Sequence, residues 1–277
     1  MASVSDRSLA GRPIGNRLVS VLLGSGRRVI GDDEFRLRAA SLLLFVVIWQ
    51  IAAYWMQSPV LPGPVAVFIR IGEALFSGEL LYHLAITLWR VTISFVVAML
   101  IGTVLGIVMG RWRRWDVFLD GWLVLGLNVP ALVTIILCYI WLGLTDFAAI
   151  VAVAINKIPT VIVTVREGAR AVDRDLMQVA EAFRLSRRRT LTKVYLPQLY
   201  PYLMAAARTG LSLIWKIVLV VELLGRSSGI GFQLNVFFQF FDITGILAYT
   251  LVFAGVVLLV EAFMMRPLER RLTAWRL

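Results

Sequence analysis

This 277-residue sequence has few of the residues on which most sites in soluble proteins are built. It contains one cysteine, Cys138, and one histidine, His83, so neither a disulfide framework nor a Cys/His metal cluster can be assembled. None of its three lysines follows a glycine, which excludes a GxxxxGK[ST] phosphate-binding loop. A catalytic triad, a paired-carboxylate site and an HExxH motif are missing as well. The sequence therefore does not indicate an enzyme, a bound cofactor or a bound metal.

The sequence also has few charged residues and many apolar ones. Only 16% of the residues are charged, against roughly a quarter in soluble domains, and 60% are hydrophobic. Such a chain needs lipid as its solvent, and a helix needs about 20 apolar residues to cross a bilayer. We expect an all-α polytopic membrane protein with one membrane domain, residues 39–277. About six transmembrane helices are predicted, at residues 39–56, 84–109, 117–143, 147–165, 199–224 and 245–265.

The remaining segments and their charges predict the orientation. Segment 60–82 is too polar to span and is expected to form a short surface helix outside. Of the 28 Lys and Arg residues, 22 fall in the N-terminal segment, two loops and the C-terminus assigned to the cytoplasm, and two fall outside. Both termini are thus expected in the cytoplasm, at a bacterial inner membrane. The net charge of +11 is explained by this topology, so no nucleic-acid partner is expected. Residues 1–38 are either an interfacial helix or a disordered tail.

Three local features of the predicted spans stand out. Asn128 and Pro130 interrupt the third span, and such a break needs protein rather than lipid around it. Gly102, Gly106 and Gly110 share one face of the second span, which lets another helix approach closely, and we expect this face to help pack a second copy. The segment 225–231, GRSSGIG, is expected to be a flexible outer loop with free backbone NH groups.

The polar stretch 166–198 predicts an exposed amphipathic helix. Leu176, Val179, Ala180 and Phe183 repeat at helical spacing, and Leu196-Pro197 is expected to stop the helix. The apolar stripe must be covered by the chain's own membrane domain, by the lipid surface or by a partner protein.

This stretch resembles the cytoplasmic signature of binding-protein-dependent ABC importer permeases. The signature reads Glu-Ala-Ala, three residues, Gly, nine residues, Ile, one residue, Leu-Pro. With Leu196-Pro197 as the anchor, Val194 takes the Ile position, residues 178–180 (QVA) take the Glu-Ala-Ala positions, and Arg184 takes the Gly position. The match is partial at its most distinctive positions.

Further blocks resemble the sulfonate, taurine and nitrate branch of this family. They are LPGP at 61–64, HLAITLWRVTISF at 83–95, NVPAL at 128–132, IWLG at 140–143, EGARAVDRDL at 167–176 and WKIVLVVELLGRSSGIG at 215–231. The resemblance implies a type I ABC importer transmembrane domain that forms the path for a small organic or inorganic anion, such as a sulfonate, nitrate or carboxylate. It also implies a homodimer, two cytoplasmic ATPase subunits that use ATP and Mg²⁺, and an external solute-binding protein. The alternative is a stand-alone polytopic carrier or a membrane-embedded enzyme.

In the family the signature segment forms a coupling helix in a groove of the ATPase. Carried onto this sequence, that role implies coupling residues at Gln178, Val179, Ala180, Glu181, Phe183, Arg184, Leu185, Ser186, Leu196 and Pro197.

Charged residues inside the predicted spans are candidates for the translocation pathway. An Arg or Lys at the centre of a membrane helix costs roughly 2.5 to 3.5 kcal/mol, so it should face protein or water. Arg208 and Lys216 lie near two full turns apart and therefore on similar faces. The candidate pathway residues are Lys157, Arg208, Trp215, Lys216 and Glu222. Pairing with neighbouring helices, or snorkelling to the surface, explains each charge equally well.

Overall fold

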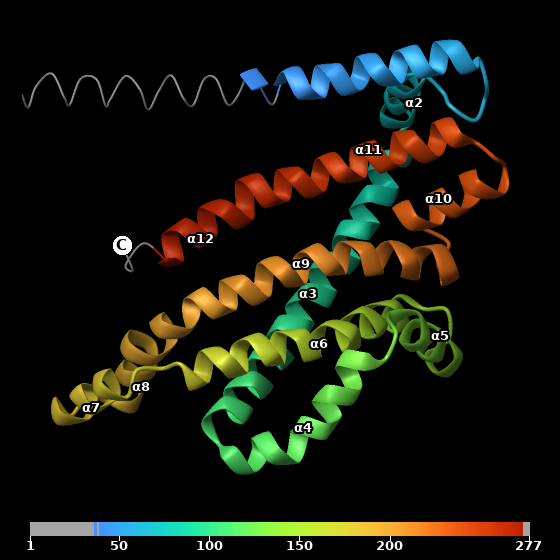
Figure 1. The fold of residues 1–277 in the computed structure, drawn as a ribbon. Coiled ribbons are helices and arrows are strands. Elements are labelled where there is room, and N and C mark those ends of the chain that lie inside the picture. Colours follow the sequence, from blue (N-terminus) through green and yellow to red (C-terminus); the bar gives the residue numbers. More distant parts are fainter. Residues whose placement is uncertain (1–35, 38, 274–277) are drawn as a thin grey trace, which may run out of the picture. The chain divides into compact units, whose positions relative to one another are not determined.

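The computed structural model describes residues 36–37 and 39–273, and all regular structure in that part of the chain is helical (Figure 1). The described residues divide into two compact units, with the boundary between Pro64 and Val65. The first unit contains the helix Ala39–Met56, where the Trp49 indole Nε1 donates a hydrogen bond to the Pro62 carbonyl oxygen over 3.0 Å. The interfacial helix considered for the N-terminus falls on residues 1–35, outside the described residues.

The second unit contains the other helices. They are α2 (Pro64–Phe76), α3 (Glu79–Arg111), α4 (Arg113–Asn128), α5 (Ala131–Leu142), α6 (Asp146–Arg170), α7 (Arg174–Ala182), α8 (Arg187–Thr190), the π-helical turn η1 (Leu191–Tyr195), α9 (Leu196–Gly225), α10 (Ile230–Gln239), α11 (Ile243–Val260), the π-helical turn η2 (Glu261–Met265) and α12 (Arg266–Thr273).

The transmembrane prediction is confirmed. Among the described residues, five helical stretches are long and apolar enough to cross a membrane, and the pair α4 and α5 makes a sixth if it counts as one span. The two helices of this pair meet at 98°. Val129 is extended and Pro130 cannot donate a backbone hydrogen bond, so the helix ends at Asn128 as the sequence predicted. The third span is thus two half-helices.

Helix α3 packs most extensively against α6, and its glycines lie in this contact. The two ribbons cross in Figure 1. A Cβ atom built on Gly102 would lie 2.6 Å from Val161 Cβ, and one on Gly106 would lie 2.8 Å from Val165 Cβ. Residue numbers rise together along both helices, so α3 and α6 run in the same direction. The assignment of this glycine face to a second copy is wrong, because a helix of the same chain already fills it.

Helix α9 completes the core against α6. Val161 and Val165 of α6 form a buried cluster with Tyr195, Leu199 and Ala206. The prediction that Leu196-Pro197 stops a helix is wrong: the chain is already helical through η1 before these residues and continues as α9 after them, so Pro197 lies inside the helical stretch and only omits one backbone hydrogen bond. The helical stretch Arg187–Gly225 therefore runs from a charged end into an apolar span.

Candidate functional site

Helix α7 is a short helix that is capped at both ends. Asp173 accepts hydrogen bonds from the backbone N–H groups of Asp175 and Leu176, which fixes the start of the helix. At the other end, the Leu185 N–H bonds the Ala180 carbonyl and the Arg184 N–H bonds the Glu181 carbonyl. These two bonds are the Schellman pattern, in which the residue after the C-cap adopts a left-handed conformation.

Arg184 occupies that left-handed position, with φ of 49°. Glycine adopts this conformation at no steric cost, whereas a side chain is strained there. The position is also one of those at which the sequence departs from the importer signature, where Arg184 takes the place of Gly. At this position the physical consequence of Arg in place of Gly is therefore a strained end of α7.

Beside α7 lies an apolar groove of about 430 Å³. Leu176 and Val179 are half-exposed, Phe183 is 77% exposed, and Ala180 is buried. The groove is lined by Leu176, Val179, Ala180, Phe183, Leu185, Lys193, Val194, Pro197 and Gln198. It is thus built from α7 together with η1 and the first turn of α9, and its apolar wall is open to a partner.

The structure brings together half of the predicted coupling residues in this groove. Val179, Ala180, Phe183, Leu185 and Pro197 line it. Gln178, Glu181 and Arg184 are exposed on or beside α7, and the Ser186 hydroxyl caps α8 by accepting from the Arg189 N–H. Leu196 is half-buried in the first turn of α9, away from the lining.

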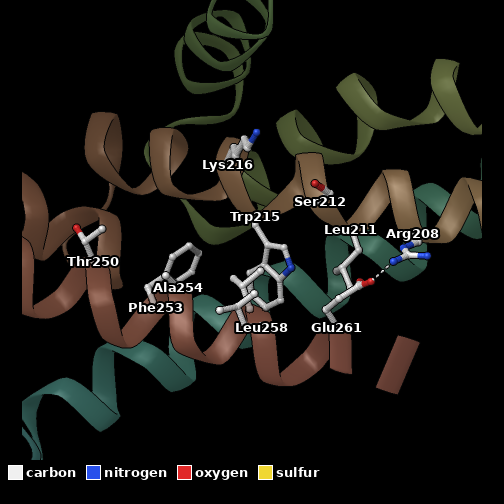
Figure 2. A pocket seen from close by; sticks show the side chains of 11 residues that line it. Arg208, Leu211, Ser212, Trp215, Lys216, Thr250, Phe253, Ala254, Leu258 and Glu261 are labelled. Atoms are coloured by element: carbon white, nitrogen blue, oxygen red, sulfur yellow. Dashed lines mark ion pairs between the residues drawn. The ribbon is translucent and has the colours of Figure 1, made fainter. Parts of the chain in front are cut away.

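A second cavity of about 540 Å³ lies between α9 and the α11–η2 segment (Figure 2). Three predicted pathway residues line it, namely Arg208, Trp215 and Lys216. The Trp215 ring is buried and meets the Phe253 ring edge to face, with ring centroids 5.6 Å apart. Arg208 and Lys216, which their helical spacing puts on similar faces of α9, thus line the same cavity, although Lys216 points away from Trp215 in Figure 2.

The two cations of this cavity differ in their partners. Arg208 forms ion pairs with Glu261 over 2.6 Å and with Glu269 over 3.1 Å, so its charge is neutralised from η2 and α12. Lys216 is exposed, and no acidic side chain of the described residues pairs with it. Of the two, Lys216 is the one without a carboxylate partner among the described residues.

Lys157 lies elsewhere, buried in α6 at 1% exposure. Its ammonium group has no hydrogen-bond partner in the described part of the chain. The tip of the side chain packs against Gly210 of α9, where an added Cβ would lie 3.1 Å from Lys157 Cε. A buried cation without a partner is costly, and such residues in membrane helices are more often functional than structural.

The fifth pathway candidate, Glu222, is fully buried in a polar network that joins α3 and α9. Its Oε1 accepts from Arg90 Nη1 over 2.7 Å, and both carboxylate oxygens lie within 3.0 Å of the Thr87 hydroxyl. Arg90, itself buried, also pairs with Asp146 at the start of α6 over 2.7 Å and donates to the Ser228 carbonyl. The Arg90–Glu222 pair therefore ties α3, α6 and α9 together, and Glu222 lines neither of the two cavities described above.

The same network holds the segment 225–231. The backbone N–H of Gly229 donates to His83 Nδ1, that of Ile230 to the Thr87 hydroxyl, and that of Gly231 to Glu222 Oε2, over 2.8 to 3.0 Å. Arg226 bonds Asp146 and the Leu144 carbonyl. The prediction of a flexible loop with free NH groups is wrong, because three of those groups are bound to buried side chains.

Sequence reasoning missed Arg90 as a partner of Glu222. The cost of burying charge in lipid could have indicated this pair. Arg90 and Glu222 lie in two different spans, each is costly there alone, and pairing them offsets both costs. The residues are 132 positions apart in the chain, and helical spacing within one span cannot reveal which spans meet.

Comparison with known proteins gives a consistent family relationship. Residues 98–273 match the family model described as binding-protein-dependent transport system inner membrane component. The chain is 31% identical over 235 residues to SsuC of Bacillus subtilis, a permease protein named for aliphatic sulfonate transport, with 84% of this chain and 85% of SsuC covered. It is 28% identical over 239 residues to the taurine transport system permease protein TauC of Escherichia coli, with 84% and 86% covered.

A solved structure supports the fold. A crystal structure of an amino acid ABC transporter with histidines matches with a TM-score of 0.54 at 17% sequence identity, covering 74% of this chain and 97% of that chain. At this identity the likeness concerns the arrangement of helices alone.

Proposed function

This chain belongs to the family of binding-protein-dependent transport system inner membrane components, and from that premise we propose that it forms the path for a small anion in an ATP-driven importer. As a permease subunit of an ABC importer it works with an ATPase and a solute-binding protein. The finer proposals concern where the ATPase docks, what is carried and how the complex is assembled.

The ATPase docks, in this proposal, on α7 and the apolar groove beside it. The observation that carries the proposal is the exposed apolar surface of α7, which lies in none of the candidate spans found among the described residues. Phe183 exposes most of its ring at the end of a helix fixed at both caps, and a rigid exposed helix transmits a bias from a partner that binds two states of the bundle unequally. ATP and Mg²⁺ are used by that partner, and this chain binds neither.

The carried solute is a small organic or inorganic anion of the sulfonate, taurine or nitrate kind. The names of two relatives, SsuC and TauC, support this class. Within the chain, Lys216 on the α9 cavity and Lys157 in α6 are cations without a carboxylate partner among the described residues, and they are the positions we assign to the anion path. Identifying the ligand carried by the partner solute-binding protein tests the class directly.

The complex contains, in this proposal, two copies of this chain and two ATPases, with both termini of each chain in the cytoplasm. The excess of Lys and Arg in the segments assigned inside supports this orientation. A single six-span subunit needs a second one to enclose a path, which supports the homodimer.

The docking proposal is tested by co-purification of the full-length chain with its ATPase. We expect Phe183→Ala, or deletion of residues 178–186, to abolish recovery of the ATPase with the permease. Phe240→Ala is the matched control, since Phe240 is 79% exposed but lies after α10, at the other end of α9 from α7. Retention of the ATPase by the deletion variant, or equal loss in both phenylalanine variants, would reject α7 as the docking site.

A further inference from the structure

The turn between α3 and α4 is a compact basic and aromatic surface that the transport proposal does not use. It contains Arg111, Trp112, Arg113, Arg114 and Trp115, called here the RWRRW turn. Helix α3 ends at Arg111 and α4 begins at Arg113, so only Trp112 separates the two helices. All five side chains are exposed and together line a groove of about 480 Å³. Because the connection is one residue long, α3 and α4 fix the backbone positions of these five residues.

The RWRRW turn has to lie at a membrane surface. Helix α3 is a candidate span, and the bent pair α4 and α5 is the next one. The residues that join two consecutive spans are those at which the chain leaves and re-enters the bilayer. Tryptophan favours the headgroup level of a bilayer, and both indoles of the turn are half-exposed.

The arginines of the turn lack a counter-charge. Within residues 39–273, no ion pair joins Arg111, Arg113 or Arg114 to an acidic side chain, and the Arg111 guanidinium lies 5.6 Å from the centroid of the Trp112 ring. The two nearest acidic residues along the chain are already engaged. Asp116 bonds Arg170 over 2.5 Å, and Asp120 bonds Arg166 over 2.9 Å. Three positive charges therefore face outward from one groove.

We propose that the RWRRW turn binds the phosphate headgroup of an anionic phospholipid such as phosphatidylglycerol. Guanidinium groups match phosphate oxygens with paired hydrogen bonds, and the indole rings fit the boundary between headgroups and acyl chains. The occupant is a lipid rather than a free phosphate because the groove joins two apolar spans and carries tryptophan beside each charge. The inference needs only the membrane location of the turn and is independent of the solute and the ATPase.

The test compares lipid preference in bilayers. The purified full-length chain is reconstituted in phosphatidylcholine bilayers that contain trace spin-labelled phosphatidylglycerol or spin-labelled phosphatidylcholine, and electron paramagnetic resonance gives the ratio of their association with the protein. An arginine near an anionic headgroup contributes roughly a fivefold preference. We expect the wild-type chain to prefer phosphatidylglycerol severalfold, and R111Q/R113Q/R114Q to reduce the ratio to near one.

The matched control is R187Q/R188Q/R189Q, which removes the same three charges from α8, where the side chains are also exposed. This variant should keep the wild-type ratio. R111K/R113K/R114K preserves the charge and the orientation signal but not the paired hydrogen bonds of a guanidinium, so the preference should fall without disappearing.

Four results would overturn the proposal. They are an unchanged ratio in the glutamine variant of the turn, an equal fall in the α8 variant, a complete loss in the lysine variant, and displacement of the labelled lipid by inorganic phosphate. An unchanged ratio would show that the turn does not bind the lipid, and an equal fall in the α8 variant would show that the preference depends on net charge alone. A complete loss in the lysine variant would indicate that the substitutions damage the structure of the turn. Displacement by inorganic phosphate would show that the ligand is a free anion and not a lipid.

Discussion

Replacing Glu222 by glutamine should destabilise the membrane bundle by about 3 kcal/mol, because it removes one partner of a buried ion pair. Oε1 accepts from Arg90, and Oε2 accepts from the Gly231 N–H over 2.9 Å. Whichever way the new amide is turned, its NH2 group faces one of these donors, so a hydrogen bond is lost as well as the charge. Arg90 keeps Asp146, which places the cost at the lower end of the range for broken buried pairs.

The measurement is the free energy of unfolding, or the midpoint of thermal unfolding, of the purified full-length chain in detergent. Glu73→Gln is the control, because Glu73 meets Arg70 over 3.5 Å with both side chains well exposed, and such pairs contribute less than about 1 kcal/mol. Stability of the Glu222→Gln variant within 1 kcal/mol of wild type would refute the reasoning. That result would mean that Glu222 carries a proton in the native state, since glutamine imitates a protonated carboxyl.

Three further predictions follow from single contacts. Arg184→Gly should stabilise the end of α7 by about 1 kcal/mol, measured as slower amide hydrogen exchange in α7, since glycine relieves the left-handed strain; unchanged exchange would show that Arg184 is not strained. Gly106→Val should cost about 1 to 3 kcal/mol in thermal unfolding by forcing α3 from Val165, whereas Gly121→Val, with nothing within 4 Å, should be neutral. Lys157→Met should raise the unfolding midpoint by removing an unpaired buried cation but lower ATP-driven uptake of taurine or a sulfonate; higher stability with unchanged uptake would remove Lys157 from the anion path.

The membrane spans could be predicted from the sequence because lipid imposes a simple rule. A helix must be apolar for about 20 residues to cross, and loops carry the charge. The helix break at Asn128 and Pro130 was predicted for the same reason, since proline removes a backbone donor wherever it stands. The 98° bend could not be predicted, because its size depends on neighbours such as Pro159, which lies 2.9 Å from a Cβ built on Gly126.

The sequence predicted only those features of the candidate sites that depend on the residues of one helix. The apolar stripe of α7 is a local periodicity, and the structure contains that helix. The interpretation of Leu196-Pro197 as a stop was wrong because the sequence does not show that the π-helical turn η1 carries the helix through the proline. Similarly, spacing brought Arg208 and Lys216 to one cavity, but the partner Glu261 comes from another helix.

Among the described residues, the charges inside the membrane helices divide into paired and unpaired groups, and we propose that this division separates structure from transport. Arg90 with Glu222, and Arg208 with Glu261, cancel each other's cost, so their presence is explained by the stability of the bundle. Lys157 and Lys216 have no such explanation among the described residues, and an anion in transit is the charge that would compensate them. A permease for anions needs cations that bind weakly enough to release, and an unpaired lysine, with a compact ammonium on a flexible stem, meets that need better than an arginine already held by two carboxylates.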